Sequence, residues 1–334
     1  MHHDQNLSKK LLEDIQRPFN EKATTITWLN NQKRDVAEQR LTDIVDHNTK
    51  SLEKLIRYVG SLPSELRMVR IGSGQLPAYT HRDWNYFYRD GSIRTWVERT
   101  YSSIGQIARE LDVRLSMHPG QFTVLASNSQ DIVERSLEEF EYHADIIRYM
   151  GYGQKWQDFK CNVHISGRQG PAGIKAILPR LSTEARNTIT IENDENAWGL
   201  EASLELEKDV ALVVDVHHHW CHSAGEYIDA NDDRVKRVID SWRGIRPAIH
   251  YSVSREELLA TSESDSQPDI RPNFQRLLAQ GFKKAKLRAH SDFYWNHAVN
   301  EWAATFAKDF DIQCESKMKN LASHKFYNNH IKGD

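Results

Sequence analysis

The sequence has few cysteines and no long apolar run. Its 334 residues include three cysteines, Cys161, Cys221 and Cys314, which are too few and too scattered for a disulfide-stabilised scaffold. No stretch approaches the roughly 20 uninterrupted apolar residues that cross a bilayer, and the opening segment MHHDQNLSKK contains no apolar signal core. These absences predict a soluble protein of the reducing cytoplasm.

A strong net charge is also absent. The chain carries 44 basic and 47 acidic residues, a net charge of −3, so an acidic polymer would have to be held by a local basic patch or by bound metal. Hydrophobic residues make up 39% and charged residues 27% of the chain, which excludes a disordered or fibrous protein. No repeat, low-complexity tract or linker marks a domain boundary.

Short apolar runs alternate with helical patterns, as is typical of a parallel α/β sheet. The runs predict seven strands: Arg67–Ile71, Val113–Met117, Cys161–Ile165, Thr188–Ile191, Ala211–Asp215, Ala248–Ser252 and Asp311–Glu315. The helical patterns cover Gln32–Val59, Ser102–Leu111, Ser129–Met150 and Leu200–Lys208. Because polar residues end the strands, a TIM (β/α)8-type barrel fits best. An open doubly wound sheet is the alternative, weakened by the lack of a G-x-G-x-x-G turn.

Two regions depart from a regular barrel. An eighth strand would have to come from Thr24–Leu29 or be missing, and Glu256–Gly281 is a longer insertion with a flexible loop at Ser262–Gln267. The predicted organisation is a polar helical segment at 1–23, one barrel domain at 24–320, and a C-terminal tail at 321–334.

Potential metal ligands follow the strands in succession: His118, His164, Glu192, Asp215 with His218, His250, and Glu315. Imidazole and carboxylate groups hold Zn or Mn, and a ring of them at one barrel mouth converges on a common point. One histidine among 16 means little. Buried Glu and Asp after apolar strands are costly without cationic partners, so a shared metal cluster accounts for the series. A structural polar network is the alternative.

Other polar residues near the strand ends allow two interpretations each. In His217–His222 the register favours His218 as the inward residue, leaving His217 and His219 as supporting or surface groups and Cys221 as a structural thiol. His290 either binds metal or caps a helix at Phe293–Lys308.

Three residues could contact nucleic acid instead of metal. Arg70 could pair with a ligand carboxylate or with a phosphate. The rigid turn at His118–Phe122 presents Gln121 beside Phe122, a pair that could wedge into a base stack or close the barrel rim.

Aromatic and basic residues are frequent in two loops, and they favour a nucleic-acid groove over a solvated surface with buried aromatic bodies. These residues are Tyr79, His81, Arg82, Trp84, Tyr86 and Tyr88 in the first loop, and Lys283, Lys284, Lys286 and Arg288 in the second.

Six ordered motifs resemble the UV damage endonucleases, metal-dependent repair enzymes whose barrel is related to endonuclease IV and xylose isomerase. The motifs are SMHPGQF (Ser116–Phe122), NVHISG (Asn162–Gly167), TIENDE (Thr190–Glu195), VVDVHHH (Val213–His219), RPAIHYS (Arg246–Ser252) and CESKMK (Cys314–Lys319). The resemblance runs from about Thr24 to Lys319.

The resemblance implies a site and a reaction. Its ligands would be His118, His164, Glu192, Asp215, His218, His250, His290 and Glu315, with Glu192 bridging two ions. Two or three divalent ions, Mn in preference to Zn or Mg, would act with His118, His164, Glu192, Asp215 and Glu315 to nick double-stranded DNA 5′ to UV photoproducts, and abasic sites are a further candidate substrate. Gln121 and Phe122 match a Gln-Tyr pair that the family inserts beside damaged bases, and Arg70 and Lys317 are candidate DNA contacts. The enzyme would act as a monomer.

Two departures separate this chain from the family pattern. Family members have a lysine two residues before the histidine that corresponds to His250, whereas this chain has Ala248, and the family's first strand has no match. One metal position should therefore be weaker and require more manganese. The alternatives are a sugar isomerase or epimerase of the same barrel superfamily and an inactive lesion-binding protein.

Overall fold

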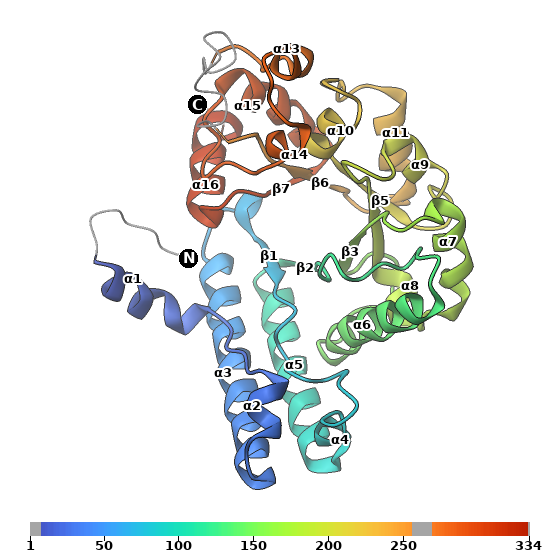
Figure 1. Ribbon diagram of the computed structural model, residues 1–334. Coiled ribbons are helices and arrows are strands. Elements are labelled where there is room, and N and C mark those ends of the chain that lie inside the picture. Colours follow the sequence, from blue (N-terminus) through green and yellow to red (C-terminus); the bar gives the residue numbers. More distant parts are fainter. Residues whose placement is uncertain (1–7, 256–268, 333–334) are drawn as a thin grey trace.

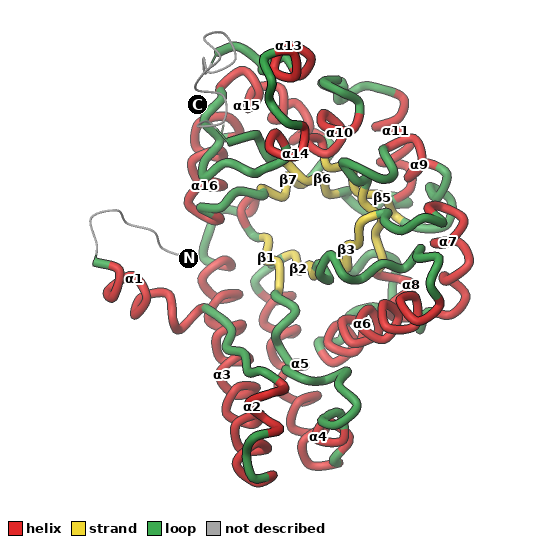
Figure 2. The backbone as a smooth tube through the Cα atoms, viewed as in Figure 1, coloured by secondary structure: helices red, strands yellow, loops and turns green. Residues whose placement is uncertain are grey.

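Seven parallel strands form one sheet that curves into a nearly closed ring (Figures 1 and 2). The computed structural model describes residues 8–255 and 269–332. Within them the strands are hydrogen-bonded in sequence order: β1 Met68–Ile71, β2 Arg114–Met117, β3 Lys160–His164, β4 Ile189–Glu192, β5 Ala211–Asp215, β6 Ala248–Tyr251 and β7 Asp311–Cys314. Each predicted strand is confirmed to within one residue at either end. The predicted TIM-type barrel is confirmed, with one strand fewer than eight among the described residues.

Helices surround the ring (Figure 2). They are α1 Lys9–Gln16, α2 Ile26–Asn30, α3 Arg34–Gly60, α4 Tyr86–Arg89, α5 Gly91–Glu110, α6 Gln130–Tyr149, α7 Gly170–Ile177, α8 Thr183–Thr188, α9 Leu200–Leu204, α10 Val216–His222, α11 Asp233–Ser241, α13 Phe274–Ala279, α14 Lys284–Leu287, α15 His297–Ala304 and α16 Lys319–Phe326. The predicted helices at Gln32–Val59 and Ser129–Met150 correspond to α3 and α6. That at Ser102–Leu111 is the second half of α5, and that at Leu200–Lys208 is shorter than predicted because only α9 is helical. None of the described helices is long and apolar enough to cross a membrane.

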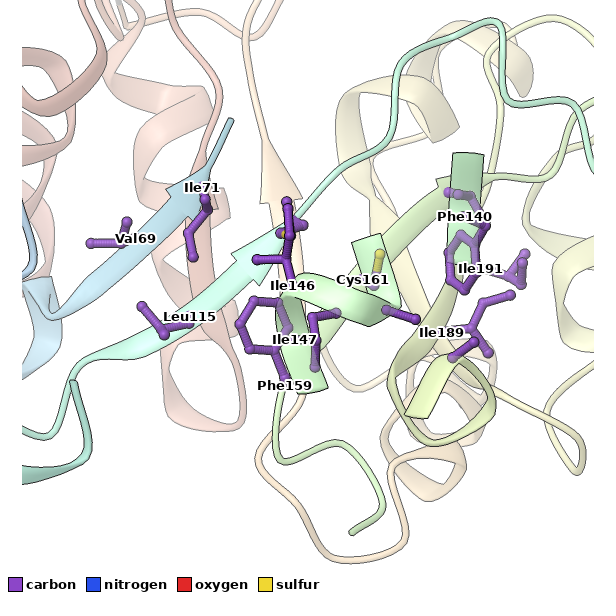
Figure 3. Packing of buried hydrophobic residues seen from close by; sticks show 14 of the residues in the cluster. Val69, Ile71, Leu115, Phe140, Ile146, Ile147, Phe159, Cys161, Ile189 and Ile191 are labelled. Carbon is purple, nitrogen blue, oxygen red and sulfur yellow. The ribbon is translucent and has the colours of Figure 1, made fainter. Parts of the chain in front are cut away.

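The strands alternate between apolar and polar residues, and this alternation divides the core in two. On β1 to β4, side chains such as Val69, Leu115 and Ile191 pack outward against the helices, as Figure 3 shows around α6. The intervening residues, such as Asn162 and Glu192, point into the barrel, because successive strand residues face opposite sides. On these four strands the barrel interior is therefore lined with polar groups, whereas Ala211, Val213 and Ala248 of β5 and β6 form a small apolar cluster with Trp242.

A seam remains between β1 and β7. These strands are the two ends of the sheet order, and a cavity of about 960 Å³ lies between them, bounded also by α3 and α16. Two ion pairs span the seam. Arg70 of β1 pairs with Glu315 at one end, and Arg114 of β2 pairs with Asp311 at the other. Asp311 also accepts at 2.8 Å from Arg246, which precedes β6. Charged side chains thus hold the ring together where backbone hydrogen bonds do not.

The alternative that Thr24–Leu29 forms the eighth strand is wrong. Ile26–Asn30 is helix α2, because the Thr25 hydroxyl accepts a hydrogen bond from the Trp28 backbone N–H and caps the first turn. The other interpretation, a missing strand, holds for the described residues. The predicted loop at Ser262–Gln267 lies outside them.

Candidate metal centre

The carboxyl ends of six neighbouring strands, β2 to β7, bring histidine and carboxylate side chains to one mouth of the barrel. The sheet register places His164 beside Glu192 and Asp215 beside His250. Four overlapping groups have ligand atoms within 4.8 Å of one another: His118–Glu192–His250, His164–Glu195–His218, Glu192–Asp215–His218 and Asp215–His250–Glu315. Seven of the eight residues that the resemblance implies as ligands therefore lie close enough to share metal ions.

Glu192 lies at the centre of this cluster. Its side chain is fully buried, with Oε1 3.0 Å from His250 Nδ1 and 3.4 Å from His218 Nδ1, and with Oε2 3.4 Å from His118 Nε2. Burial opposes ionisation, yet His250, His164 and His118 hold the pKa of Glu192 well below its usual range. A buried carboxylate whose two oxygens face different imidazoles is suited to bridging two cations.

Asp215 contributes a buried carboxylate oxygen to the same cluster. Its Oδ1 accepts the backbone N–H groups of His217 and His218 at 2.8 and 2.7 Å, and so caps helix α10. Its Oδ2 is buried without a hydrogen-bond partner in the described part of the chain, and the nearest cationic atom is His218 Nε2 at 3.8 Å. Burial raises the pKa of Asp215 to about 7. An unpartnered carboxylate oxygen beside imidazoles fits a divalent cation.

Backbone carbonyls orient two of the imidazole rings. His118 Nδ1 lies 3.0 Å from Pro119 O, and His218 Nδ1 lies 3.0 Å from Asn193 O. A carbonyl only accepts, so in each ring Nδ1 carries the hydrogen and Nε2 is left with a lone pair. Such partners are typical of metal-binding histidines, because they fix the ring and its tautomer.

Two histidines of the cluster have pKa values that are shifted in opposite directions. Burial disfavours the charged form of both, but Glu192 and Asp194 outweigh it at His164 and raise its pKa to about 9. At His250 burial prevails and lowers the pKa to about 4. At neutral pH the metal-free cluster therefore holds a charged His164 and a neutral His250.

His290 lies outside the four groups. Its backbone bridges to Ser254, its ring is 6.0 Å from that of His217, and its pKa is lowered by burial. It borders the seam cavity with Glu315, so its assignment as a ligand stays a prediction. The buried His217 stacks on Trp220 at 5.6 Å, and His219 binds Glu226 at 2.9 Å. Both thus have supporting contacts, while Cys221 packs in an apolar cluster with Trp220.

The predicted DNA contacts differ in their surroundings. Phe122 follows β2 with its side chain 71% exposed, the highest value among the large hydrophobic residues that the structure describes, and Gln121 beside it is also exposed. Arg70 pairs with Glu315, which fits the expected pairing with a ligand carboxylate. Lys317 is half-exposed, with Nζ 3.9 Å from Asp292.

The first aromatic loop fits the alternative of buried aromatic bodies better than it fits a stacking surface. Trp84 and Tyr88 are buried and donate to Asn30 Oδ1 and Pro77 O, and Tyr79 donates to Asp145. In the second loop Arg288 donates to Glu195 at 2.6 Å. These aromatic rings stabilise the helices and are not free to stack on bases.

Sequence reasoning missed three polar residues of the site. Glu195 joins one of the four groups, and its only signal was its place in the motif Thr190–Glu195. Asn162 donates to Glu192 and accepts from Thr190 at 2.7 Å. Lys160 contacts His250 from inside the barrel. The last two lie within an apolar run, where a polar side chain gives no sign of its direction.

The comparisons with known proteins point to one family. The family model described as UV-endonuclease UvdE matches residues 7–331. The UV DNA damage endonuclease of Bacillus velezensis is 26% identical over 257 residues, 73% of this chain and 76% of that protein. That of Bacillus thuringiensis subsp. konkukian is 23% identical over 319 residues, 91% of this chain and 88% of that protein. The crystal structure of SacUVDE covers 92% of this chain and 91% of its own, with a TM-score of 0.70 and 22% identity, so it supports the fold.

Proposed function

The chain belongs to the UV-endonuclease UvdE family, and we propose that it nicks double-stranded DNA on the 5′ side of UV photoproducts by a multi-metal hydrolytic reaction. The strand-end cluster carries the proposal, because four overlapping ligand groups, two of which contain Glu192, lie at the carboxyl ends of the barrel strands. The sugar isomerase alternative has no support from the family match. The cytoplasmic location, the monomeric state and the three-segment organisation stay predictions.

The cluster fits divalent cations by its chemistry. Nitrogen and carboxylate donors suit Mn and Zn, and the carboxylates among them keep Mg within range. Two or three such ions, when bound, would stabilise the attacking and the departing oxygens of phosphodiester hydrolysis. The residues that would hold them are His118, His164, Glu192, Asp215, His218, His250 and Glu315, with His290 as a further candidate.

The remaining residues would bind and orient the DNA. Phe122 would enter a distorted base stack close to the cluster, and its exposed ring in the loop that also carries His118 supports this role. Gln121 offers an amide for the displaced bases. Arg70 and Lys317 line the seam cavity and would contact phosphates, Arg70 by exchanging its pairing with Glu315.

A nicking assay tests the proposal. The substrate is an end-labelled duplex with a single cyclobutane dimer, incubated with the protein and manganese. We expect one cut on the 5′ side that leaves a 3′-hydroxyl, and no cut with Glu192→Gln. Glu205→Gln is the matched control, because Glu205 is an exposed carboxylate in the turn directly after α9, outside the barrel.

The outcomes separate the alternatives. Binding to the damaged duplex without any cut at saturating manganese would contradict the endonuclease and favour the inactive lesion-binding protein. Cutting of undamaged and damaged duplexes alike would contradict the lesion specificity.

A further inference from the structure

The seam cavity of about 960 Å³ lies where the ring of strands is open, between β1 and β7 (Figure 2). The facing edges of these two strands bound it, together with α3 and α16. A TIM-type barrel closes with eight strands, whereas the described residues form seven. The seam cavity therefore lies at the one place in the ring where two strands that follow each other are not hydrogen-bonded within the described chain.

The hydrogen-bond pattern shows which backbone groups point into this cavity. The N–H of Arg114 donates to Arg67 O at 2.8 Å, so the odd-numbered residues of β1 bond to β2. The N–H of Asp311 donates to Pro247 O at 2.9 Å, so the odd-numbered residues of β7 bond to β6. Successive residues of a strand direct their N–H and C=O groups to opposite sides. The residues whose backbone groups face the cavity are Met68 and Arg70 on β1 and Ile312 and Cys314 on β7.

These two strand edges are unpaired. The backbone groups that face the cavity have no hydrogen-bond partner within residues 8–255 and 269–332. An unpaired edge is a row of donors and acceptors to which another extended chain can add. Here two such edges face each other, so an extended segment between them would be hydrogen-bonded on both sides. A helix or a small apolar molecule in the same volume would leave both rows unpaired.

The two faces of the seam cavity differ in polarity. On the helix side its lining includes Leu52, Leu55 and Val59 of α3 and Phe326 of α16. On the side of the barrel interior its lining is polar and consists of Arg70, Gln313 and Glu315. Successive side chains of an extended chain point to opposite faces. A segment that fits both faces therefore alternates between apolar and polar residues.

We propose that the seam cavity binds an extended segment of a partner polypeptide, with alternating apolar and polar residues, which adds between β1 and β7 as an eighth strand. Both strands are four residues long, so a segment of about four to six residues would pair along their whole length. Residues 1–7, outside the described residues, contain only Met1 and Leu7 as apolar residues and lack this alternation. The inference goes beyond the proposed function and does not depend on it.

Selection from a random peptide library tests the pattern. Peptides of about eight residues are displayed on phage and selected on the immobilised full chain. We expect the enriched sequences to alternate apolar and polar residues, and the tightest of them to bind the full chain as a free peptide in a fluorescence-anisotropy titration. One control peptide has the same composition in a scrambled order, and a second is N-methylated at alternate residues, which removes its donors to one strand edge. Each should bind at least about tenfold more weakly.

Amide hydrogen exchange of the parent protein locates the bound peptide. With the peptide at about ten times its Kd, exchange at the N–H groups that face the seam cavity should slow about tenfold. These are the amides of Met68, Arg70, Ile312 and Cys314. The amides of β4, which is paired with β3 and β5, should not change.

Ile312→Pro tests the site from the side of the protein. Proline removes an N–H that faces the cavity, not one that bonds to β6, and its ring projects toward the bound segment. Proline is tolerated on edge strands for the same reason. We expect peptide binding at least about tenfold weaker than that of the parent. Ile312→Val keeps the N–H and is the matched control, which should bind as the parent does.

Each outcome decides the inference. A selection that enriches no binder, or binders without alternation, would overturn it. A bound peptide that leaves the four amides unprotected, or unchanged binding by Ile312→Pro, would overturn it as well. Protection of the same amides by duplex DNA without peptide would assign the cavity to the substrate instead. If Ile312→Pro does not fold, the amide exchange of the parent still decides. A parent protein that binds the peptide but nicks no DNA would contradict the proposed function alone.

Discussion

Asp215→Asn should stabilise the metal-free protein and weaken the metal-bound one. Burial raises the pKa of Asp215 from 3.8 to about 7, so in the metal-free protein the folded state keeps the proton that the unfolded state loses. The free energy of unfolding therefore falls as the pH rises from about 4 to 7, and the difference corresponds to about 4 kcal/mol at about 1.36 kcal/mol per pKa unit. Asparagine removes this cost.

Asparagine also leaves an amide N–H₂ where the carboxylate oxygen Oδ2 has no hydrogen-bond partner among the described residues. An unsatisfied buried donor costs about 1–3 kcal/mol, while the Oδ1 contacts that cap α10 can remain. The expected net gain at pH 8 is about 1–3 kcal/mol, and it should vanish near pH 4, below which the carboxyl group is protonated in both states.

Excess manganese should reverse the sign of the stability difference between Asp215→Asn and the parent protein. An ion at 100 times its Kd stabilises the folded parent by about 2.7 kcal/mol, and the variant, which lacks one ligand, should gain less. The assay is urea unfolding followed by tryptophan fluorescence, at pH 5 and pH 8, in chelator and in excess manganese. Asp309→Asn, an exposed control, should change neither value. A variant less stable than the parent at pH 8 in chelator, or equal gains from manganese, would refute the reasoning.

Three further changes have definite expected outcomes. Glu192 belongs to two ligand groups and His164 to one, so Glu192→Gln should remove more than one equivalent of bound manganese and His164→Asn about one. Metal analysis of both variants checks this, and full metal content in both would contradict the cluster. Phe122→Ala should weaken binding to the dimer-containing duplex by a few kcal/mol at most, without loss of metal, in a fluorescence-anisotropy titration. The control is Ile245→Ala, which changes an exposed residue at the opposite end of the barrel and should bind as the parent does. Asp311→Asn should lower the free energy of unfolding by about 1–3 kcal/mol, because two arginines lose their shared carboxylate; an unchanged urea midpoint would contradict a supporting role for the seam ion pairs.

The sequence predicted the strands well because each is a short apolar run that ends at a polar residue. It predicted His118, Glu192 and Asp215 as neighbours for the same reason, since parallel strands bring their carboxyl ends to one edge. His218 could be separated from His217 and His219 by register alone, and the structure places it in two ligand groups.

Other features of the site could not be predicted from a linear pattern. Lys160 meets His250 across 90 residues of chain, and nothing local to either residue indicates the contact. The burial of Trp84 and Tyr88 depends on helices that fold over their loop, so aromatic content alone suggested a stacking surface that the fold does not provide. The helix at Ile26–Asn30 depends on a capping threonine, a signal weaker than the pattern that suggested a strand.

The Glu315 carboxylate takes part in two interactions that compete with each other. It belongs to the arginine contact that joins the two ends of the barrel, and it belongs to one of the ligand groups. A cation that binds this carboxylate competes with Arg70 for it. Metal binding at this position therefore weakens the Arg70–Glu315 ion pair that joins the two ends of the barrel. The barrel should therefore loosen at its seam as that position fills, and backbone amides of β1 and β7 should exchange with solvent faster in the loaded protein than those of β3 and β4.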